Sequence, residues 1–425
     1  MTTTASLTLA SHVRLSVRQI NRSNLSAGVS VLLLYLFAGL PIQIGVMTQL
    51  GLSSGESSSW FFVTWMTTGL FSFALALFTR QPVSINLSIP ALIFMAGAAG
   101  GYSLPQIIGA NLMVGVVAIA LSTFRIADVF ARLVPSQVAI GVFAGSMLLF
   151  MLKTSQMAVA DLAIAGPIIA GFILTLAATR NQLLSVGVAA VVGLLGVVVT
   201  DGVPGAGASA GLPRFFPLTI ELDPSAMIAL GVPLLILVVG VGNTQSLAVL
   251  RSEGYAAKGN LFGLVAGAAT VVNALGGGHA DGIGGTTTVV SAGSNAGPSA
   301  YRYWAILISS VPVVVIAFAA SPIIAFVQEL PVTYPLTVGA LALAMPFKQV
   351  MVKTLAGDNR TGALVAVLVA AIPLQLVGMP MAFWALVAGT AVVVLGSGQT
   401  RRYWRRTQSV FVSHMNRLGS APAAR

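Results

Sequence analysis

Two ionisable side chains, His279 and Asp281, stand inside an apolar part of the sequence, where they could bind and release a proton. They belong to the run 276–285, in which six of ten residues are glycine. A carboxylate is costly in an apolar medium and usually functional there, and low-dielectric surroundings favour its protonated form. An imidazole titrates near neutral pH and could share the proton or bind substrate. Structural roles are the alternative: Asp281 could cap a helix or bond to broken backbone, and His279 could be a structural histidine.

Polar side chains in the middle of apolar stretches add candidates for substrate binding, because they need hydrogen-bond partners there. The cluster Asn243–Ser246 interrupts 234–250, and Gln43 follows Pro41 in the first apolar segment. Hydrogen bonding between helices is the competing explanation for the cluster. The complete set predicted to bind substrate is Gln43, Ser84, Asn86, Asn243, Thr244, Gln245, His279, Asp281, Gly282 and Thr286.

Two segments contain residues that prevent an unbroken helix from crossing the membrane. In the first, Pro82 and Pro90 bracket an alternating stretch that suits an extended strand, so a helix can begin only near Pro90. In the second, the glycine run delays the helix until about Thr286. Non-helical backbone at membrane depth is tolerated only inside protein or around a water-filled cavity. Because each helix start offers free N–H groups to an anion or an electron-rich edge, the two breaks predict a substrate site at the midplane.

Other kinds of chemistry lack the residues that they need. An intramembrane aspartyl protease needs two facing aspartates, and only Asp281 is suitably placed. A metal site needs clustered ligands, and the sequence offers only His279 and Asp281, with no cysteine. The glycine run lacks the lysine of a phosphate loop, and no ATP-binding segment is found. We therefore predict no enzyme activity, no catalytic residue, no metal and no cofactor, with a proton as the coupling ion. A passive channel stays open as an alternative.

The composition places these residues in a polytopic membrane protein. Of 425 residues, 56% are hydrophobic and 7% are charged, which is too little charge for a soluble surface. Apolar runs of roughly 18–20 residues are long enough to cross the hydrocarbon core. We expect an all-α protein with about fourteen such segments, at 25–47, 59–79, 83–101, 104–123, 136–152, 160–178, 183–200, 225–248, 260–275, 280–294, 303–326, 332–346, 361–378 and 382–398.

The distribution of basic residues predicts the orientation. Threading the segments from a cytoplasmic N-terminus leaves 19 of the 21 lysines and arginines on the cytoplasmic side, with only Lys153 and Arg214 outside. This segregation follows the positive-inside rule and predicts an inner-membrane protein with both termini in the cytoplasm. The same rule accounts for the net charge of +11 without nucleic acid. The basic motif Arg401–Arg406 is interpreted as an interface anchor rather than a lipid-binding switch.

A linker rich in glycine, proline and alanine, 202–224, divides the chain into two halves of seven segments each. Because seven is odd, the second half must start from the opposite side, which is the arrangement of an inverted repeat. A shift of 196 residues supports this interpretation, since it moves Ala96-Gly97 onto Ala292-Gly293 and Pro135 onto Pro331. The predicted domains are a cytoplasmic N-terminal segment (1–24), a first repeat (25–201), the extracytoplasmic linker (202–224), a second repeat (225–398) and a basic cytoplasmic tail (399–425).

The stretch Gly242–Tyr255, GNTQSLAVLRSEGY, resembles the benzoate:proton symporter family of the BenE type, in which a polar helix centre runs into A-V-L-R-x-x-G-Y. The residues Asn273–Gly293, with Gly278-His279 ahead of a threonine-rich half-helix, are also similar to that family, as is 134–145. The resemblance extends loosely over most of the chain and is most specific in 242–293.

The resemblance implies a fold shared with nucleobase permeases and sulfate-type anion transporters. This fold is a seven-plus-seven inverted repeat with core and gate domains, in which short strands of segments three and ten pair beside the substrate. The resemblance also implies proton-coupled symport of benzoate or a similar small aromatic carboxylate by alternating access. The motif Asp281–Gly284 looks closer to the acidic motif of nucleobase permeases, so a nucleobase or an inorganic anion is the alternative cargo. The expected partners are this small molecule and the lipid bilayer, without nucleic acid and with a homodimer left open.

Overall fold

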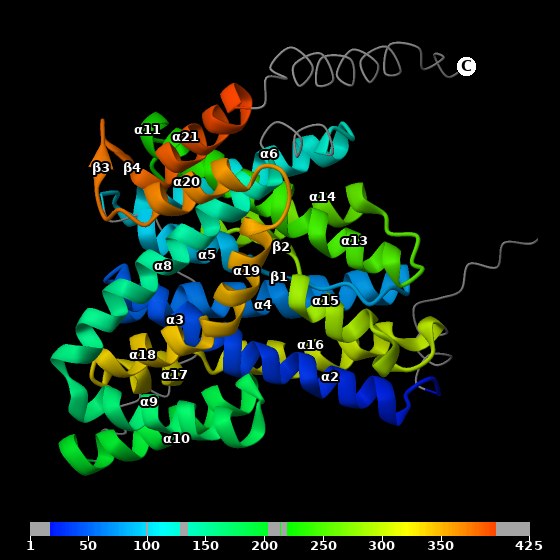
Figure 1. Cartoon of the computed structure of the whole chain (residues 1–425). Coiled ribbons are helices and arrows are strands. Elements are labelled where there is room, and N and C mark those ends of the chain that lie inside the picture. The colour runs from blue at the N-terminus through cyan, green and yellow to red at the C-terminus, as the bar shows by residue number, and fades with distance from the viewer. Residues whose placement is uncertain (1–17, 99–100, 128–134, 203–212, 214–218, 397–425) are drawn as a thin grey trace, which may run out of the picture.

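The computed structural model describes residues 18–98, 101–127, 135–202, 213 and 219–396. Within these residues the chain is mostly helical, and most of the long helices run from side to side in the view of Figure 1. The predicted N-terminal segment and linker lie largely outside the described residues, and the predicted tail lies wholly outside them.

Eight helices of the described residues are long and apolar enough to cross a membrane. They are Arg22–Gln49 (α2, η1 and α3), Ser54–Thr79 (α4), Leu104–Thr123 (α6), Ser136–Ala160 (α8), Leu162–Thr179 (α9), Gln182–Asp201 (α10), Pro224–Ser252 (α11 to α13, with η2 and η3) and Ser299–Phe318 (η5 and α16). Shorter elements form the other six predicted segments. They are β1 (Ile85–Leu87) with α5 (Ile89–Ala98), α14 (Gly259–Leu275), β2 (Asp281–Ile283) with α15 (Gly285–Ala292), α18 (Thr333–Ala342) with α19 (Ala344–Leu355), α20 (Arg360–Ala370) and α21 (Met381–Gly396).

The shift of 196 residues that relates the two halves of the sequence also relates their structural elements. Adding 196 to the bounds of β1 gives the bounds of β2, and adding it to the first residue of α5 gives the first residue of α15. The last residues of α4 and α14, Thr79 and Leu275, also differ by 196. The helix α8 shifts onto 332–356, which α18 and α19 occupy together. The two halves therefore repeat one succession of elements, interrupted at the same place.

The two short strands pair across the repeats, and their register has the symmetry of an inverted repeat. They are antiparallel, and the register pairs Ile85 with Ile283, Asn86 with Gly282 and Leu87 with Asp281. Subtracting 196 from the β2 positions 283, 282 and 281 gives 87, 86 and 85, which is the β1 strand in reverse order. The pairing is thus symmetric about Asn86 and Gly282, so the pseudo-two-fold axis passes through the centre of the strand pair.

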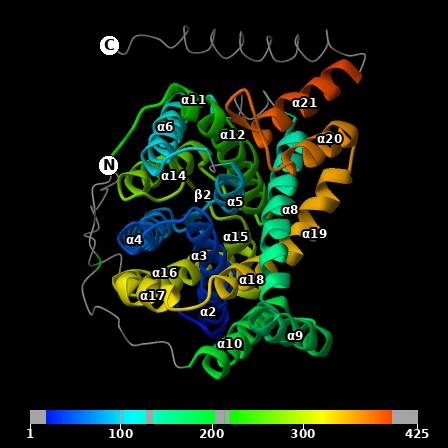
Figure 2. The same ribbon diagram turned by 90° about the vertical axis from the view of Figure 1, so that its left-hand side faces the viewer.

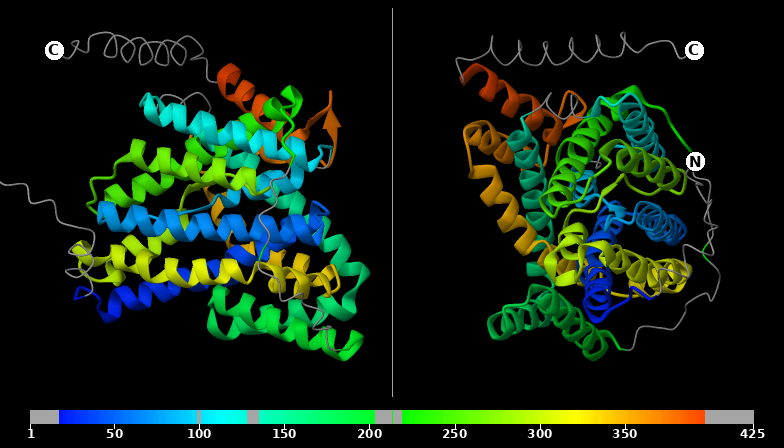
Figure 3. Two further views of the ribbon diagram at one scale, coloured as in Figure 1. Left: turned by 180° about the vertical axis from the view of Figure 1, so that it is seen from behind. Right: turned by 90° about the vertical axis from the view of Figure 1, so that its right-hand side faces the viewer.

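The first four segments of each half form the core domain. Figure 3 (left) shows cyan α6, green α14, blue α4 and yellow α16 stacked in this order, and neighbouring helices in the stack are in contact. The packing follows the repeat. The helices α4 and α14 are the second segments of their halves, and α6 and α16 are the fourth, so the contact of α4 with α16 corresponds to the contact of α14 with α6. Close approach of α6 and α14 depends on glycine, because a Cβ on Gly115 would lie 3.0 Å from the carbonyl oxygen of Gly267.

The last three segments of each half form the gate domain. Here α9 packs on α10 as α20 packs on α21, and α8 packs on α20 as α18 packs on α9. Figure 2 shows α8, α19 and α20 on the side opposite α4, α6, α14 and α16. A turn of 112° separates α17 (Ala320–Gln328), at the end of segment eleven, from α18, at the start of the gate part of the second repeat.

Several predicted segment boundaries are wrong. The segment predicted at 136–152 continues as α8 to Ala160, so Lys153 lies on a helix rather than in a loop. The segment predicted at 332–346 continues as α19 to Leu355, so Lys348 and Lys353 lie on a helix rather than in a loop. The segment predicted at 361–378 ends as a helix at Ala370, and the hairpin of β3 (Gln375–Leu376) and β4 (Met379–Pro380) follows. Pro373 and Pro380 lack the N–H group of a helix interior, which explains why the helix stops while the apolar sequence continues.

Candidate functional site

The predicted breaks in segments three and ten lie side by side at the centre of the core. β1 and β2 pair with one another, and each strand leads within two residues into a half-length helix, α5 or α15. Thr288 is the first residue of α15 whose N–H donates to a turn of its own helix, to the carbonyl of Gly284 at 3.2 Å. The N–H groups of Gly285, Thr286 and Thr287 precede that bond and have no acceptor within the helix.

A group of polar side chains from β1, α15 and the first segment surrounds the entrance to α15. The hydroxyls of Ser84 and Thr287 are 2.7 Å apart, and Asn86 donates to the hydroxyl oxygen of Thr287 at 3.2 Å. The amide of Asn86 also lies 3.5 Å from the phenol oxygen of Tyr35, which begins the π-helical turn η1 (Tyr35–Gly39). A Cβ on Gly284 would clash with Ser84, Asn86 and Thr287, so the missing side chain leaves room for these three polar groups.

The predicted polar cluster of segment eight holds strand β2 in place. The side-chain oxygen of Asn243 accepts from the N–H of Ile283 at 2.7 Å, and the hydroxyl of Ser246 donates to the carbonyl of Ile283 at 2.8 Å. Asn243 ends the π-helical stretch η3 (Ile236–Asn243), and both side chains are buried. Thr244 is exposed, whereas Gln245 is half-buried and accepts from Lys353 of the gate at 3.4 Å. Two residues of the cluster, Asn243 and Ser246, therefore bond to β2, and the other two, Thr244 and Gln245, are at least partly exposed.

Asp281 and His279 lie on the inner side of β2, completely buried. Alternate strand residues face the same way, and Ile283 packs with residues of α4 and α14, so Asp281 faces those helices too. Neither carboxylate oxygen of Asp281 has a hydrogen-bond partner, and Oδ1 lies 3.7 Å from Nδ1 of His279. Nε2 of His279 and Nε1 of neighbouring Trp60 are also unpartnered.

A chain of buried amides and hydroxyls connects the first segment to this pair. Gln43 donates to the hydroxyl oxygen of Thr64 at 2.7 Å and accepts from Nε1 of Trp65 at 2.8 Å. One turn further, Thr67 donates to Oδ1 of Asn273 at 2.6 Å, and Nδ2 of Asn273 lies 3.4 Å from the carbonyl of His279. Both ends of the Gln43 amide are thus used within the core.

Sequence reasoning missed several residues of this region: Tyr35, Trp60, Thr64, Thr67, Thr270, Asn273 and Thr287. Thr64, Thr67 and Thr270 also bond to carbonyls of their own helices, and such threonines have no pattern that separates them from ordinary helix residues. Asn273 could have been found, because it is an amide within an apolar segment, as Asn243 is.

Exposure separates the predicted site residues into two groups. Thr244 and Thr286 are exposed and Gln245 is half-buried, although they lie next to the central strands, and Gly285 beside Thr286 is exposed as well. Ser84, Asn86, Gln43, Asn243, Gly282, His279 and Asp281 are buried. The start of α15 and the start of α13 (Thr244–Ser252) are therefore the exposed parts of this region. Among the described residues, no group of three histidine, aspartate or glutamate side chains could hold a metal ion.

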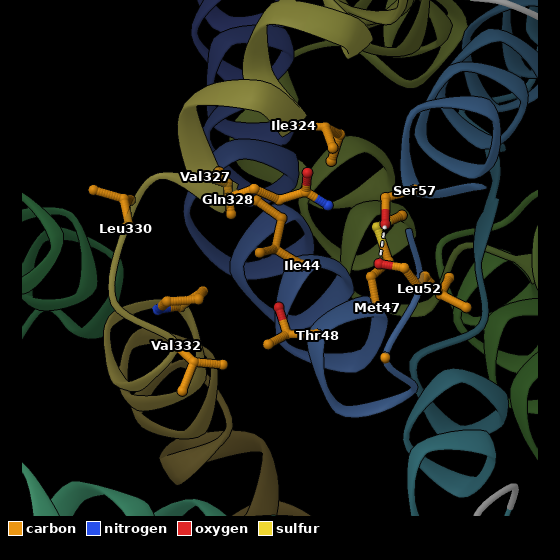
Figure 4. A pocket seen from close by; sticks show the side chains of 12 residues that line it. Ile44, Met47, Thr48, Leu52, Ser57, Ile324, Val327, Gln328, Leu330 and Val332 are labelled. Carbon is orange, nitrogen blue, oxygen red and sulfur yellow. Dashed lines mark hydrogen bonds between the residues drawn. The ribbon is translucent and has the colours of Figure 1, made fainter. Parts of the chain in front are cut away.

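A cavity of about 280 Å³ lies elsewhere, at the boundary between the core and gate domains (Figure 4). Its walls come from the end of α3 (Leu40–Gln49), the start of α4, α17 and the turn before α18, and they are mostly apolar. The lining residues are Ile44, Met47, Thr48, Gly51, Leu52, Ser57, Ile324, Val327, Gln328, Leu330, Val332 and Pro335. None of the predicted site residues contributes to it.

Comparison with known proteins agrees with this architecture. The family model described as "BenE: Benzoate membrane transport protein" matches residues 18–395. The inner membrane protein YdcO of Escherichia coli (strain K12) is 24% identical over 351 residues, which are 81% of this chain and 88% of that protein. The transmembrane domain of the cyanobacterium bicarbonate transporter BicA gives a TM-score of 0.52 at 15% identity and covers 88% of this chain and 96% of that one. SLC26A9 gives a TM-score of 0.56 at 13% identity and covers 90% of this chain and 65% of that one.

The structural matches show the fold alone, and they agree with the fold class predicted from the sequence, the inverted repeat with core and gate domains. The family match covers far more than the specific stretch 242–293 on which the predicted resemblance depends. The chain therefore belongs to the benzoate membrane transport protein (BenE) family and is a membrane transport protein.

Proposed function

We propose that this protein is a secondary active transporter that moves benzoate or a similar small aromatic carboxylate across the inner membrane in symport with protons. The observation that carries the proposal is the exposure of Gly285 and Thr286, which begin α15 beside the central strand pair. Three N–H groups without helical acceptors and the positive end of a helix dipole favour a carboxylate at this place. The family description, which names benzoate, supports the aromatic carboxylate.

Alternating access follows from the division into core and gate. The proposed site lies on core elements, and the gate helices α8 and α19 lie on the other side of the boundary between the two domains. Movement of the core relative to the gate would expose the first turn of α15 to one side of the membrane and then to the other. In this proposal both termini are cytoplasmic, as the distribution of basic residues predicts.

Proton coupling is assigned to Asp281 with help from His279. A buried carboxylate without a hydrogen-bond partner is unfavourable as an anion, so these surroundings favour its neutral, protonated form. The backbone N–H of Asp281 donates to Thr270 at 2.9 Å, which fixes the residue on the strand that leads into α15. Substrate binding at α15 and protonation of Asp281 would therefore act on the same short stretch of chain.

An inorganic anion is the second candidate cargo, because one of the structurally similar proteins is a bicarbonate transporter. A nucleobase is the third, from the acidic motif in segment ten. The buried position of Asp281, behind the exposed turn of α15, speaks against direct contact between its carboxylate and a bound base.

Uptake by the purified protein in proteoliposomes tests the proposed function. With an inward proton gradient, labelled benzoate should accumulate above its external concentration, and a protonophore should abolish the accumulation. Bicarbonate, sulfate, uracil and xanthine should compete poorly with labelled benzoate. Uptake of bicarbonate or uracil in place of benzoate would overturn the substrate, and benzoate uptake that ignores the proton gradient would overturn the coupling.

A further inference from the structure

Lys353 reaches from the gate domain to the core domain next to the proposed site. It lies in the last turn of α19, which packs beside α8 on the gate side (Figure 2). Its ammonium nitrogen is 3.4 Å from the side-chain oxygen of Gln245 on α13 of the core. This contact joins the two domains that the proposed mechanism moves relative to one another.

The charge of Lys353 has no acidic partner among the described residues. The two acid–base pairs within 4 Å there are His279 with Asp281 and Arg302 with Glu253. Lys353 is exposed, and its ammonium group is hydrogen-bonded to a neutral amide oxygen. An ammonium group that is not neutralised by a carboxylate remains available to an anion.

A short series of contacts connects this lysine to the first turn of α15. Gln245 is next in sequence to Ser246, which donates to the carbonyl of Ile283 at 2.8 Å. A Cβ on Gly285 would lie 3.8 Å from the Ser246 hydroxyl. Gln245 thus lies on the helix that contacts α15 on the core, and its side-chain oxygen lies beside the ammonium of Lys353 on the gate.

We propose that Lys353 is the gate residue that selects an anionic substrate, which is a refinement that rests on the proposed function. The carboxylate of the substrate binds at the first turn of α15 and takes the place of Gln245 as the partner of the ammonium group. Gln245 keeps the lysine in position while the site is empty. A cargo without a negative charge gains nothing from this contact, so Lys353 distinguishes benzoate from a neutral molecule of the same shape.

A second explanation for Lys353 needs no substrate. A cation in the last turn of a helix is favourable to the helix dipole, and a lysine near the cytoplasmic side follows the positive-inside rule. Lys348 provides the matched control, because it is an exposed lysine on the same helix. The two lysines are five positions apart, which places them on different faces of α19.

The test compares wild-type protein with Lys353→Gln, Lys353→Arg and Lys348→Gln. Binding is measured by the shift in melting temperature with benzoate, its neutral analogue benzamide, bicarbonate and uracil. The anion that stabilises the wild type is then used for uptake in proteoliposomes at low and high salt. We expect Lys353→Gln to weaken anion binding about tenfold, to reduce the preference for benzoate over benzamide and to make the KM less dependent on salt. Lys353→Arg should restore most of the affinity, and Lys348→Gln should behave as the wild type.

The outcomes separate this inference from the proposed function. Equal loss of affinity in Lys353→Gln and Lys348→Gln, or an unchanged KM in Lys353→Gln, would overturn the role of Lys353 while benzoate uptake by the wild type stands. Stabilisation of the wild type by bicarbonate alone would overturn benzoate as cargo. The effect of the Lys353 variants would then be measured on the binding and uptake of bicarbonate. A wild type stabilised by uracil alone, or by none of these compounds, would overturn both proposals.

Discussion

At the scale of single residues, Asp281 differs from the other described acids in being fully buried without a hydrogen bond to its carboxylate. Replacement by asparagine preserves the shape and removes the proton-binding group. In proteoliposomes, Asp281→Asn should still bind benzoate, but its uptake should no longer follow an imposed proton gradient. Asp358→Asn, in an exposed turn, is the matched control and should retain coupling. Gradient-driven accumulation by Asp281→Asn would refute the assignment of the proton to this residue.

Gly284 and Gly285 are neighbours whose surroundings predict opposite results. A Cβ at Gly284 would clash with Ser84 and Thr287, whereas the nearest atom to a Cβ at Gly285 is 3.8 Å away. Gly284→Ala should therefore destabilise the protein by about 1–3 kcal/mol, a typical cost of overpacking. Gly285→Ala should leave the melting temperature almost unchanged. Equal melting temperatures for the two variants would contradict the tight packing around the entrance to α15.

At the scale of elements, η3 and α13 supply the side-chain partners of the backbone N–H and carbonyl of Ile283, the last residue of strand β2. Asn243→Ala leaves the buried N–H of Ile283 without its acceptor, which typically costs about 1–3 kcal/mol. The expected result is a lower midpoint of unfolding in detergent. Thr123→Val serves as the control, because Thr123 is exposed and bonds only to its own helix. A midpoint for Asn243→Ala equal to that of the control would mean that β2 does not need this bond.

The sequence was sufficient to predict the breaks in segments three and ten, because proline and glycine exclude helix by local geometry alone. The observed starts of α5 and α15, Ile89 and Gly285, lie one residue from the predicted Pro90 and Thr286. Pairing of the strands was expected from the family resemblance. The hairpin after α20 was not predicted, although Pro373 and Pro380 are local signals for the end of the helix. The continuation of α19 to Leu355 was not predicted either, because the polar residues after 346 made a loop the expected structure.

The candidate site was predictable in part for a similar reason. Polar residues inside apolar segments drew attention to Ser84, Asn86 and Asn243, and the structure places them around the strands. The sequence could not distinguish the buried face from the exposed one. That distinction depends on the side to which each strand residue points, and therefore on the packing of α4 against β1 and of α14 against β2.

At the scale of the whole molecule, α20 tests the membrane orientation. Its eleven residues rise only about 16 Å, less than the roughly 30 Å of the hydrocarbon core, so the apolar residues after it must complete the crossing. The chain has no cysteine, so single cysteines can report their side. A membrane-impermeant maleimide should label Gln375→Cys in intact cells and Asp358→Cys only after permeabilisation. Labelling of both in intact cells would contradict the predicted topology.

The central claim is that cargo binds where the two repeats are interrupted, at the first turn of α15 beside the strand pair. Crystals soaked with a bromobenzoate would test it most directly, since bromine can be located by anomalous diffraction. We expect the bromine peak next to Gly285–Thr287, with the carboxylate toward the N–H groups of that turn. A peak in the 280 Å³ cavity between Ile44 and Val332, with none beside α15, would contradict the account.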